Sequence, residues 1–180
     1  MQHMPQLFTR LLAERLAALS SLSVSEGHAG ELLRPGEVWV APGGFHMDLT
    51  KAADGIRLCT HKGEPENSCR AAVDVLFRSV AQTYGARTLA VILTGMGQDG
   101  LLGCQAISDA GGCVIAQDEA SSVVWGMPGA VTRAGLAEKI LPLADMAGEI
   151  NRLVSVRSRI ATSQIPVRAE AHTSCPVEVI

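Results

Sequence analysis

The residues best placed to do chemistry lie in one segment, Leu89-Ala-Val-Ile-Leu-Thr-Gly-Met-Gly-Gln-Asp-Gly100, in which an apolar run leads into three glycines and a carboxylate. Two chemistries fit this pattern. Gly95, Gly97 and Gly100 spell G-x-G-x-x-G, the fingerprint that holds a pyrophosphate at a helix N-terminus in dinucleotide-binding domains. Asp99 would instead act as a catalytic carboxylate at the carboxyl end of a buried parallel strand.

The dinucleotide interpretation has one observation for it and one against it. Asp118-Glu119 follows the glycines by about 20 residues, where a ribose-binding acid is expected. However, Asp99 would place a fixed negative charge where free N–H groups must attract a phosphate. A third interpretation is structural, because an aspartate near a helix start satisfies free N–H groups as a cap.

Composition limits the class of protein. The 180 residues are 47% apolar but only 3% aromatic, which predicts one domain with an aliphatic core, typical of a parallel sheet under helices. A net charge of −3 without a run of Lys or Arg indicates no nucleic-acid partner. The five cysteines form no C-x-x-C pair and the five histidines are scattered, so the sequence predicts reduced thiols, with Cys104 and Cys113 packed in the core, and no metal site.

Targeting signals are not evident. The start, Met-Gln-His-Met-Pro, is not followed by an apolar signal-peptide region, and no apolar run reaches the roughly 18 residues that span a bilayer. We therefore expect a cytoplasmic protein without membrane insertion.

Periodicity predicts alternating strands and helices. Strands are expected over 37–41, 88–93, 113–116 and 138–141, with a hairpin around Asp54-Gly55. Helices are expected over 68–83, 99–110 and 143–154, with a short one opening at Met127-Pro128. A further helix follows Pro5, and its apolar stripe is Leu7, Leu11, Leu12, Leu16 and Leu19. Residues 20–35 are expected to form a connection and 157–180 a flexible tail.

This order predicts an α/β fold: a doubly wound, mostly parallel sheet with flanking helices and a β-hairpin. Several segments also resemble one family. Leu93-Thr-Gly-Met-Gly-Gln-Asp-Gly100 is similar to the L-T-G-M-G-x-D-G signature of CheB-type chemotaxis methylesterases. Further segments match in family order over residues 1–155: Gln2-His-Met-Pro5 with Phe8-Thr9, Ala41-Pro-Gly43 with His46, Arg70–Phe77, and Gln117–Ser121 with Gly126-Met-Pro128.

The resemblance implies an activity and a site. Members of this family are protein-glutamate methylesterases, which hydrolyse methyl esters on chemoreceptor cytoplasmic domains by Ser-His-Asp chemistry and without a cofactor; the family also deamidates receptor glutamines. His3 matches the catalytic histidine, Asp99 the catalytic aspartate, and Met96 the position whose backbone N–H helps to form the oxyanion hole. We expect a hydrogen-bonded structural role for His46, and a shaping rather than chemical role for Asp118, Glu119 and Ser121.

One part of the family pattern is not found. The nucleophilic serine lies in a G-x-S-x-G-G turn upstream of the histidine, and this sequence contains no G-x-S-x-G. Residues 1–156 therefore read as a catalytic domain that lacks its first strand or strands, and the receiver domain of many members is not recognised either. We expect the chain alone to be inactive. Two other interpretations stay open: a non-catalytic remnant that binds receptor or partner, and, less favoured, a dinucleotide binder.

Overall fold

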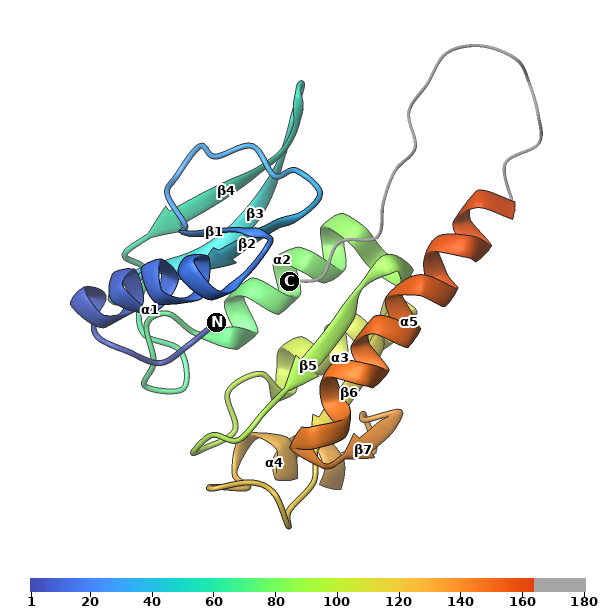
Figure 1. Ribbon diagram of the computed structural model, residues 1–180. Coiled ribbons are helices and arrows are strands. Elements are labelled where there is room, and N and C mark those ends of the chain that lie inside the picture. The colour runs from blue at the N-terminus through green and yellow to red at the C-terminus, as the bar shows by residue number, and fades with distance from the viewer. Residues whose placement is uncertain (164–180) are drawn as a thin grey trace.

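The computed structural model describes the backbone of residues 1–163 and the side chains of residues 1–155. Its centre is a parallel three-stranded sheet in the order β5-β6-β7, formed by Leu89–Ile92, Cys113–Gln117 and Lys139–Leu141 (Figure 1). Parallel neighbours require crossover connections, and here they are helical: α3 (Leu101–Asp109) joins β5 to β6, and α4 (Met127–Arg133) joins β6 to β7.

Strand alternation explains why this sheet is covered on both faces. Leu89 and Ile115 point to one face and pack with Met146 of α5 (Leu143–Ser163). Ala90 and Val114 point to the other face and join the core formed with α2 (Val73–Tyr84), α3 and α4. Successive side chains on a strand point to opposite faces of the sheet, so an apolar strand of this kind is buried on both faces.

A second parallel pair and a hairpin complete the structure. β1 (Ser23–Glu26) pairs with β2 (Glu37–Val40) under α1 (Gln6–Leu19). β3 (His46–Ala52) and β4 (Gly55–His61) form an antiparallel hairpin, and β3 packs against α2. A short 3-10 helix, η1 (Gly85–Arg87), leads into β5. The predicted α/β class with a parallel sheet, flanking helices and a hairpin is confirmed; within residues 1–163, β1 and β5 each have a strand partner on one side only.

β1 corrects the prediction of a connection over 20–35. Three of its four residues are Ser or Glu, and only Val24 is buried. A polar strand of this length has no period-2 apolar signal, because its pairing with β2 rather than its side chains stabilises it.

The helix predicted after Pro5 is present as α1, but its apolar stripe is mostly exposed. The helix forms, but it buries Thr9 and Ala13 against β1 and β2 and leaves most of its leucines on the surface. Leu7, Leu11 and Leu19 are 59%, 45% and 78% exposed. Helical spacing therefore predicts the helix correctly but not the side of it that meets the sheet.

Two boundaries also differ from expectation. α2 begins at Val73 rather than near 68, because Asn67 and Ser68 adopt positive φ angles of 52° and 62°. The backbone of α5 continues to Ser163, through a stretch without Gly or Pro, so the helix extends beyond the predicted 143–154. The flexible tail expected over 157–180 stays a prediction, and its residues 164–180 lie outside the described residues. No helix within residues 1–163 combines the length and apolar character that a bilayer crossing requires.

Candidate active site

Asp99 lies in the turn between β5 and α3. The turn reverses direction through Gly97 and Gly100, whose φ angles of 81° and 93° favour glycine. A Cβ at Gly100 would also lie 3.0 Å from Val73 Cγ1. The two glycines therefore bring the Asp99 carboxylate, which is 2% exposed, against the start of α2.

Four donors surround the Asp99 carboxylate. Oδ2 accepts from Val73 N–H (2.6 Å) and lies 2.7 Å from His3 Nε2, while Oδ1 accepts from Asp74 N–H and the Asn67 side-chain amide (both 3.1 Å). The N-cap residue of α2, Ala72, has no side chain that can cap the helix. Asp99 therefore caps α2 from a distant part of the chain, which fixes the carboxylate in one orientation.

These contacts decide the charge of Asp99. Burial raises the pKa of a carboxyl group, but the hydrogen bonds from His3, Val73, Asp74 and Asn67 outweigh it and hold the pKa of Asp99 below its ordinary value. Asp99 is thus an anion at neutral pH, as a residue that orients a histidine must be.

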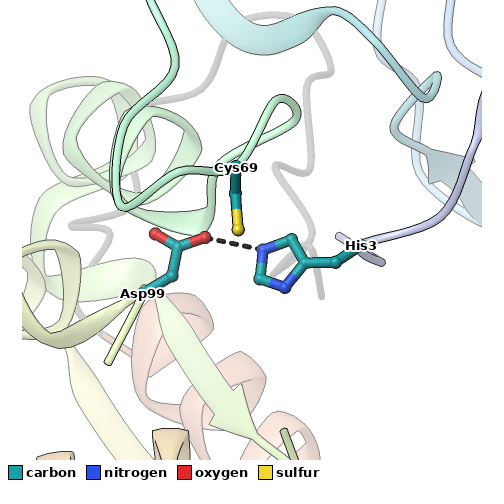
Figure 2. A group of neighbouring side chains, drawn as sticks. All are labelled: His3, Cys69 and Asp99. Atoms are coloured by element: carbon teal, nitrogen blue, oxygen red, sulfur yellow. Dashed lines mark hydrogen bonds and ion pairs between the residues drawn. The ribbon is translucent and has the colours of Figure 1, made fainter. Parts of the chain in front are cut away.

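His3 approaches this anion from the segment before α1. Because Asp99 is an anion, His3 Nε2 must donate to Oδ2, and in the neutral form of the imidazole Nδ1 then has a lone pair. Figure 2 shows Nδ1 turned away from the carboxylate. The imidazole is 29% exposed, which leaves Nδ1 accessible to a reacting group. The structure thus brings together the two side chains that the sequence singled out, although residue 3 is 96 positions from residue 99.

A second carboxylate, Asp74, supports the first. Asp74 accepts from the Asn67 amide (2.8 Å) and from Gly103 N–H at the start of α3 (2.6 Å). Burial is the largest influence on Asp74 and raises its pKa, against the hydrogen bonds from Gly103 and Asn67. Asn67 therefore donates to two neighbouring carboxylates, and this reduces the repulsion between them.

The same contact bears on the dinucleotide interpretation. A pyrophosphate would need the N–H groups at the start of α3, the helix that follows the glycines. One of them, Gly103 N–H, already donates to Asp74, and Asp99 lies beside the same turn. Two carboxylates at this helix start repel an anion, so the glycines do not form a phosphate cradle here.

A cavity of about 600 Å³ borders His3, the partner of Asp99. Its wall includes His3, Met96 and Gly97 together with the side of β5 that has no strand partner. Met96 is 81% exposed and lines this cavity. Met96, the predicted oxyanion-hole position, thus borders the same cavity as His3.

Polar contacts from β6 and the following loop hold the turn that carries Met96. Gln117 is fully buried; its side-chain oxygen accepts from Thr94 N–H (2.8 Å), and its amide donates to the carbonyl oxygen of Ser121. Gly126 lies so close that an added Cβ would be 2.7 Å from Gly95 O and 2.8 Å from Gly97 N. Only glycine permits this approach, so residues 117–126 shape the turn.

The other candidates in this loop have local roles. Asp118 accepts from the Ser121 backbone N–H (3.0 Å) and from its hydroxyl, three residues along the chain, as the side chain of a helix N-cap does. These contacts agree with the shaping role expected of Asp118 and Ser121. His46 also has the structural role that was predicted: it is 1% exposed, its Nε2 donates to Glu64 O (2.9 Å), and its Nδ1 accepts from Ala72 N–H (3.3 Å).

Cys69 is the neighbour that sequence reasoning missed. Its sulfur and the ligand atoms of His3 and Asp99 all lie within 4.8 Å of one another. Figure 2 shows the sulfur pointing toward the His3–Asp99 hydrogen bond. Burial and the charge of Asp99 raise the pKa of the Cys69 thiol, so it rests protonated. Asn67, Asp74 and Gln117 were missed as well; a buried polar residue has no sequence signal when its partners are distant along the chain.

The fold and this pair define a class of protein: an α/β domain with a histidine–carboxylate pair suited to acyl transfer, at the carboxyl end of a parallel strand. The sequence model of CheB methylesterase matches residues 1–150, and the chain belongs to this family.

Known relatives agree with this assignment. The chain is 53% identical over 153 residues to a protein-glutamate methylesterase/protein-glutamine glutaminase of Trichodesmium erythraeum, covering 85% of this chain and 44% of the relative. A relative of the same name from Paramagnetospirillum magneticum is 52% identical over 157 residues, covering 87% and 41%. The crystal structure of the Thermotoga maritima CheB methylesterase catalytic domain is 41% identical, with a TM-score of 0.82, and the match covers 85% of this chain and 81% of that one. The chain thus spans less than half the length of the first two relatives.

Proposed function

We propose that this chain supplies the histidine, the aspartate and part of the oxyanion hole of a protein-glutamate methylesterase. The hydrogen bond of 2.7 Å between His3 Nε2 and the buried Asp99 is the observation that carries the proposal, because it leaves Nδ1 as a base held by an anion. The substrates would be methyl esters of protein glutamate side chains, in line with the names of the relatives. The family resemblance puts these esters on the cytoplasmic domains of chemoreceptors, so the chain would act in the cytoplasm.

The chemistry needs a serine from a G-x-S-x-G turn, which this sequence does not contain. As the serine oxygen attacks the ester carbonyl, His3 Nδ1 takes its proton, and Asp99 stabilises the imidazolium. The negative charge on the carbonyl oxygen would be met by the Met96 N–H. Collapse of the intermediate expels methanol, which leaves with the proton from His3. Water then hydrolyses the acyl-serine by the same steps and releases the glutamate side chain.

Partners follow from this role. A segment that carries the serine turn must meet the cavity beside β5, where the strand edge and His3 are both accessible. A receiver domain, as in many members of the family, would be a second partner. No step of this chemistry requires a cofactor or nucleic acid.

The test is methanol release from methylated receptor fragments by two proteins. The 180-residue chain alone is expected to release methanol at the background rate. A fusion that places the amino-terminal segment of the Thermotoga maritima catalytic domain, with its serine turn, before Met1 is expected to be active. His3→Ala in the fusion should lower kcat by about 10⁶-fold, whereas Cys59→Ser, which borders neither cavity beside His3, should not lower it.

Two results would contradict the proposal: release by the chain alone well above background, or a folded fusion that is inactive. The second would favour the non-catalytic alternative. In that case, the chain should still bind receptor fragments in a pull-down without hydrolysing them.

A further inference from the structure

We propose that Cys69, His3 and Asp99 form a binding site for a thiophilic divalent cation of the Zn²⁺ class. The three residues offer one sulfur, one nitrogen and one oxygen ligand from three separate segments. Each ligand atom lies within 4.8 Å of the others, and Figure 2 shows the sulfur and the imidazole converging on the carboxylate. Their positions in the sequence, 3, 69 and 99, have no ligand spacing, which is why the scattered histidines predicted no metal site.

The geometry is close to what zinc requires. Ligand atoms around a tetrahedral Zn²⁺ lie about 3.3–3.6 Å apart, given Zn–N and Zn–O near 2.0–2.1 Å and Zn–S near 2.3 Å. The His3–Asp99 pair, now 2.7 Å apart, must open by about 0.6 Å, and the widest pair must close by about 1.2 Å at most. His3 can make this adjustment, because it precedes α1 and is 29% exposed.

A metal ion can replace the proton on His3 Nε2 without leaving any proton unaccounted for. Nε2 must give up its hydrogen to bind the metal, and the neutral imidazole keeps one proton by carrying it on Nδ1. The Asp99 Oδ2 lone pair that accepted from His3 then becomes a ligand, while Val73 N–H stays bound to the same oxygen. Cys69 releases its thiol proton to solvent, so binding liberates one proton for each metal ion.

The charge and the accessibility of the three ligands favour binding of a divalent cation. A thiolate and a carboxylate together neutralise a divalent cation, and this compensates the buried charge of Asp99, which hydrogen-bond donors alone balance in the metal-free site. Sulfur and imidazole ligands select Zn²⁺ over Mg²⁺ or Ca²⁺. His3 and Cys69 border both the cavity beside β5 and a smaller one beside Gly43 and Gly44, so a water molecule can supply the fourth ligand.

A metal at this position excludes the proposed hydrolysis. It takes Nε2 of His3 and breaks the hydrogen bond that orients the imidazole. This consequence rests on the proposed function, but metal binding itself does not, so the two can fail separately.

Calorimetric titration of the full chain with Zn²⁺ tests the site, and Co²⁺ absorption reports whether a thiolate is a ligand. We expect one ion per chain. Cys69→Ser and His3→Gln should each weaken binding by at least about tenfold and remove the sulfur-to-Co²⁺ charge-transfer band or shift it. The matched control is Cys59→Ser, another half-buried free thiol, which should bind Zn²⁺ unchanged.

Cys175→Ser completes the design, since Cys175 and His172 lie beyond the described residues and could bind metal on their own. The proposal is overturned if the chain binds no Zn²⁺, if Cys69→Ser binds as well as the parent, or if Cys175→Ser alone abolishes binding. Circular dichroism verifies that each variant is folded, and His3→Gln decides the question if Cys69→Ser is not.

Discussion

Two histidines lie near the start of α2 and differ in what their ring nitrogens meet. His46 on β3 is 1% exposed, and both of its nitrogens are engaged by the backbone, one by Glu64 O and one by Ala72 N–H. His3 is 29% exposed and uses one nitrogen for Asp99, leaving the other available. The first arrangement can only stabilise the fold, whereas the second can exchange a proton with a substrate.

The comparison extends to the helix that both regions contact. Ala72, Val73 and Asp74 carry consecutive backbone N–H groups at the start of α2; His46 accepts the first and Asp99 the next two. Asp99 thus belongs to both regions, as a structural cap and as the partner of His3. The family resemblance implies only a catalytic role for Asp99, whereas its hydrogen bonds to α2 add a structural one.

The largest effect is expected from Asp99→Ala. This change leaves two N–H groups of α2 without their acceptor in a buried site and removes one of the two hydrogen bonds of the Asn67 amide, so we expect a loss of about 3–5 kcal/mol in the free energy of unfolding. Urea denaturation followed by circular dichroism measures it. Asp99→Asn keeps one acceptor oxygen and should lose less; equal losses for both variants would mean that capping is not the main role of the carboxylate.

His46→Ala is expected to have an intermediate effect. It removes a buried ring, and it leaves Ala72 N–H and Glu64 O unpaired, so we expect a loss of about 2–4 kcal/mol in the same measurement. His46→Asn, whose side-chain oxygen can replace Nδ1 as the acceptor, serves as the matched control and should recover part of it. A loss below that of His3→Ala would reverse the comparison of the two histidines.

His3→Ala should have the smallest effect on stability, under about 1 kcal/mol, because the imidazole is partly exposed and Asp99 keeps three other donors. The same denaturation experiment measures this change. His3→Gln, which retains a donor, should lie still closer to the parent. A loss comparable to that of His46→Ala would show that His3, too, is mainly structural.

Local signals in the amino-acid sequence account for much of the fold. The Asp54-Gly55 turn predicts the β3–β4 hairpin, and apolar periodicity predicts β5, β6 and most of α2 to α5. β1 is not predictable in this way, since its stability comes from pairing with β2. Nor is the start of α2, because its cap is supplied by Asp99 from 25–26 residues away.

The residues of the site, like the elements of the fold, were only partly predictable from the sequence. His3 and Asp99 lie in motifs that a family signature contains, so the sequence alone identifies them. Asn67, Asp74 and Gln117 are recognisable only through the hydrogen bonds they make in the folded chain. Cys69 stands in the same category, because what distinguishes it from Cys59 is the set of side chains that surround it in space.

The shared cap of α2 has a consequence for how the chain folds. The N–H groups of residues 72–74 find their acceptors 25–26 residues away, on β3 on one side and after β5 on the other. Closing such loops costs chain entropy before any contact rewards it. The first turn of α2 is therefore expected to become protected from amide hydrogen exchange late in folding, after β3 and β5 have docked. Slow exchange at these three amides would mark a chain in which His46 and Asp99 have already reached their positions against α2.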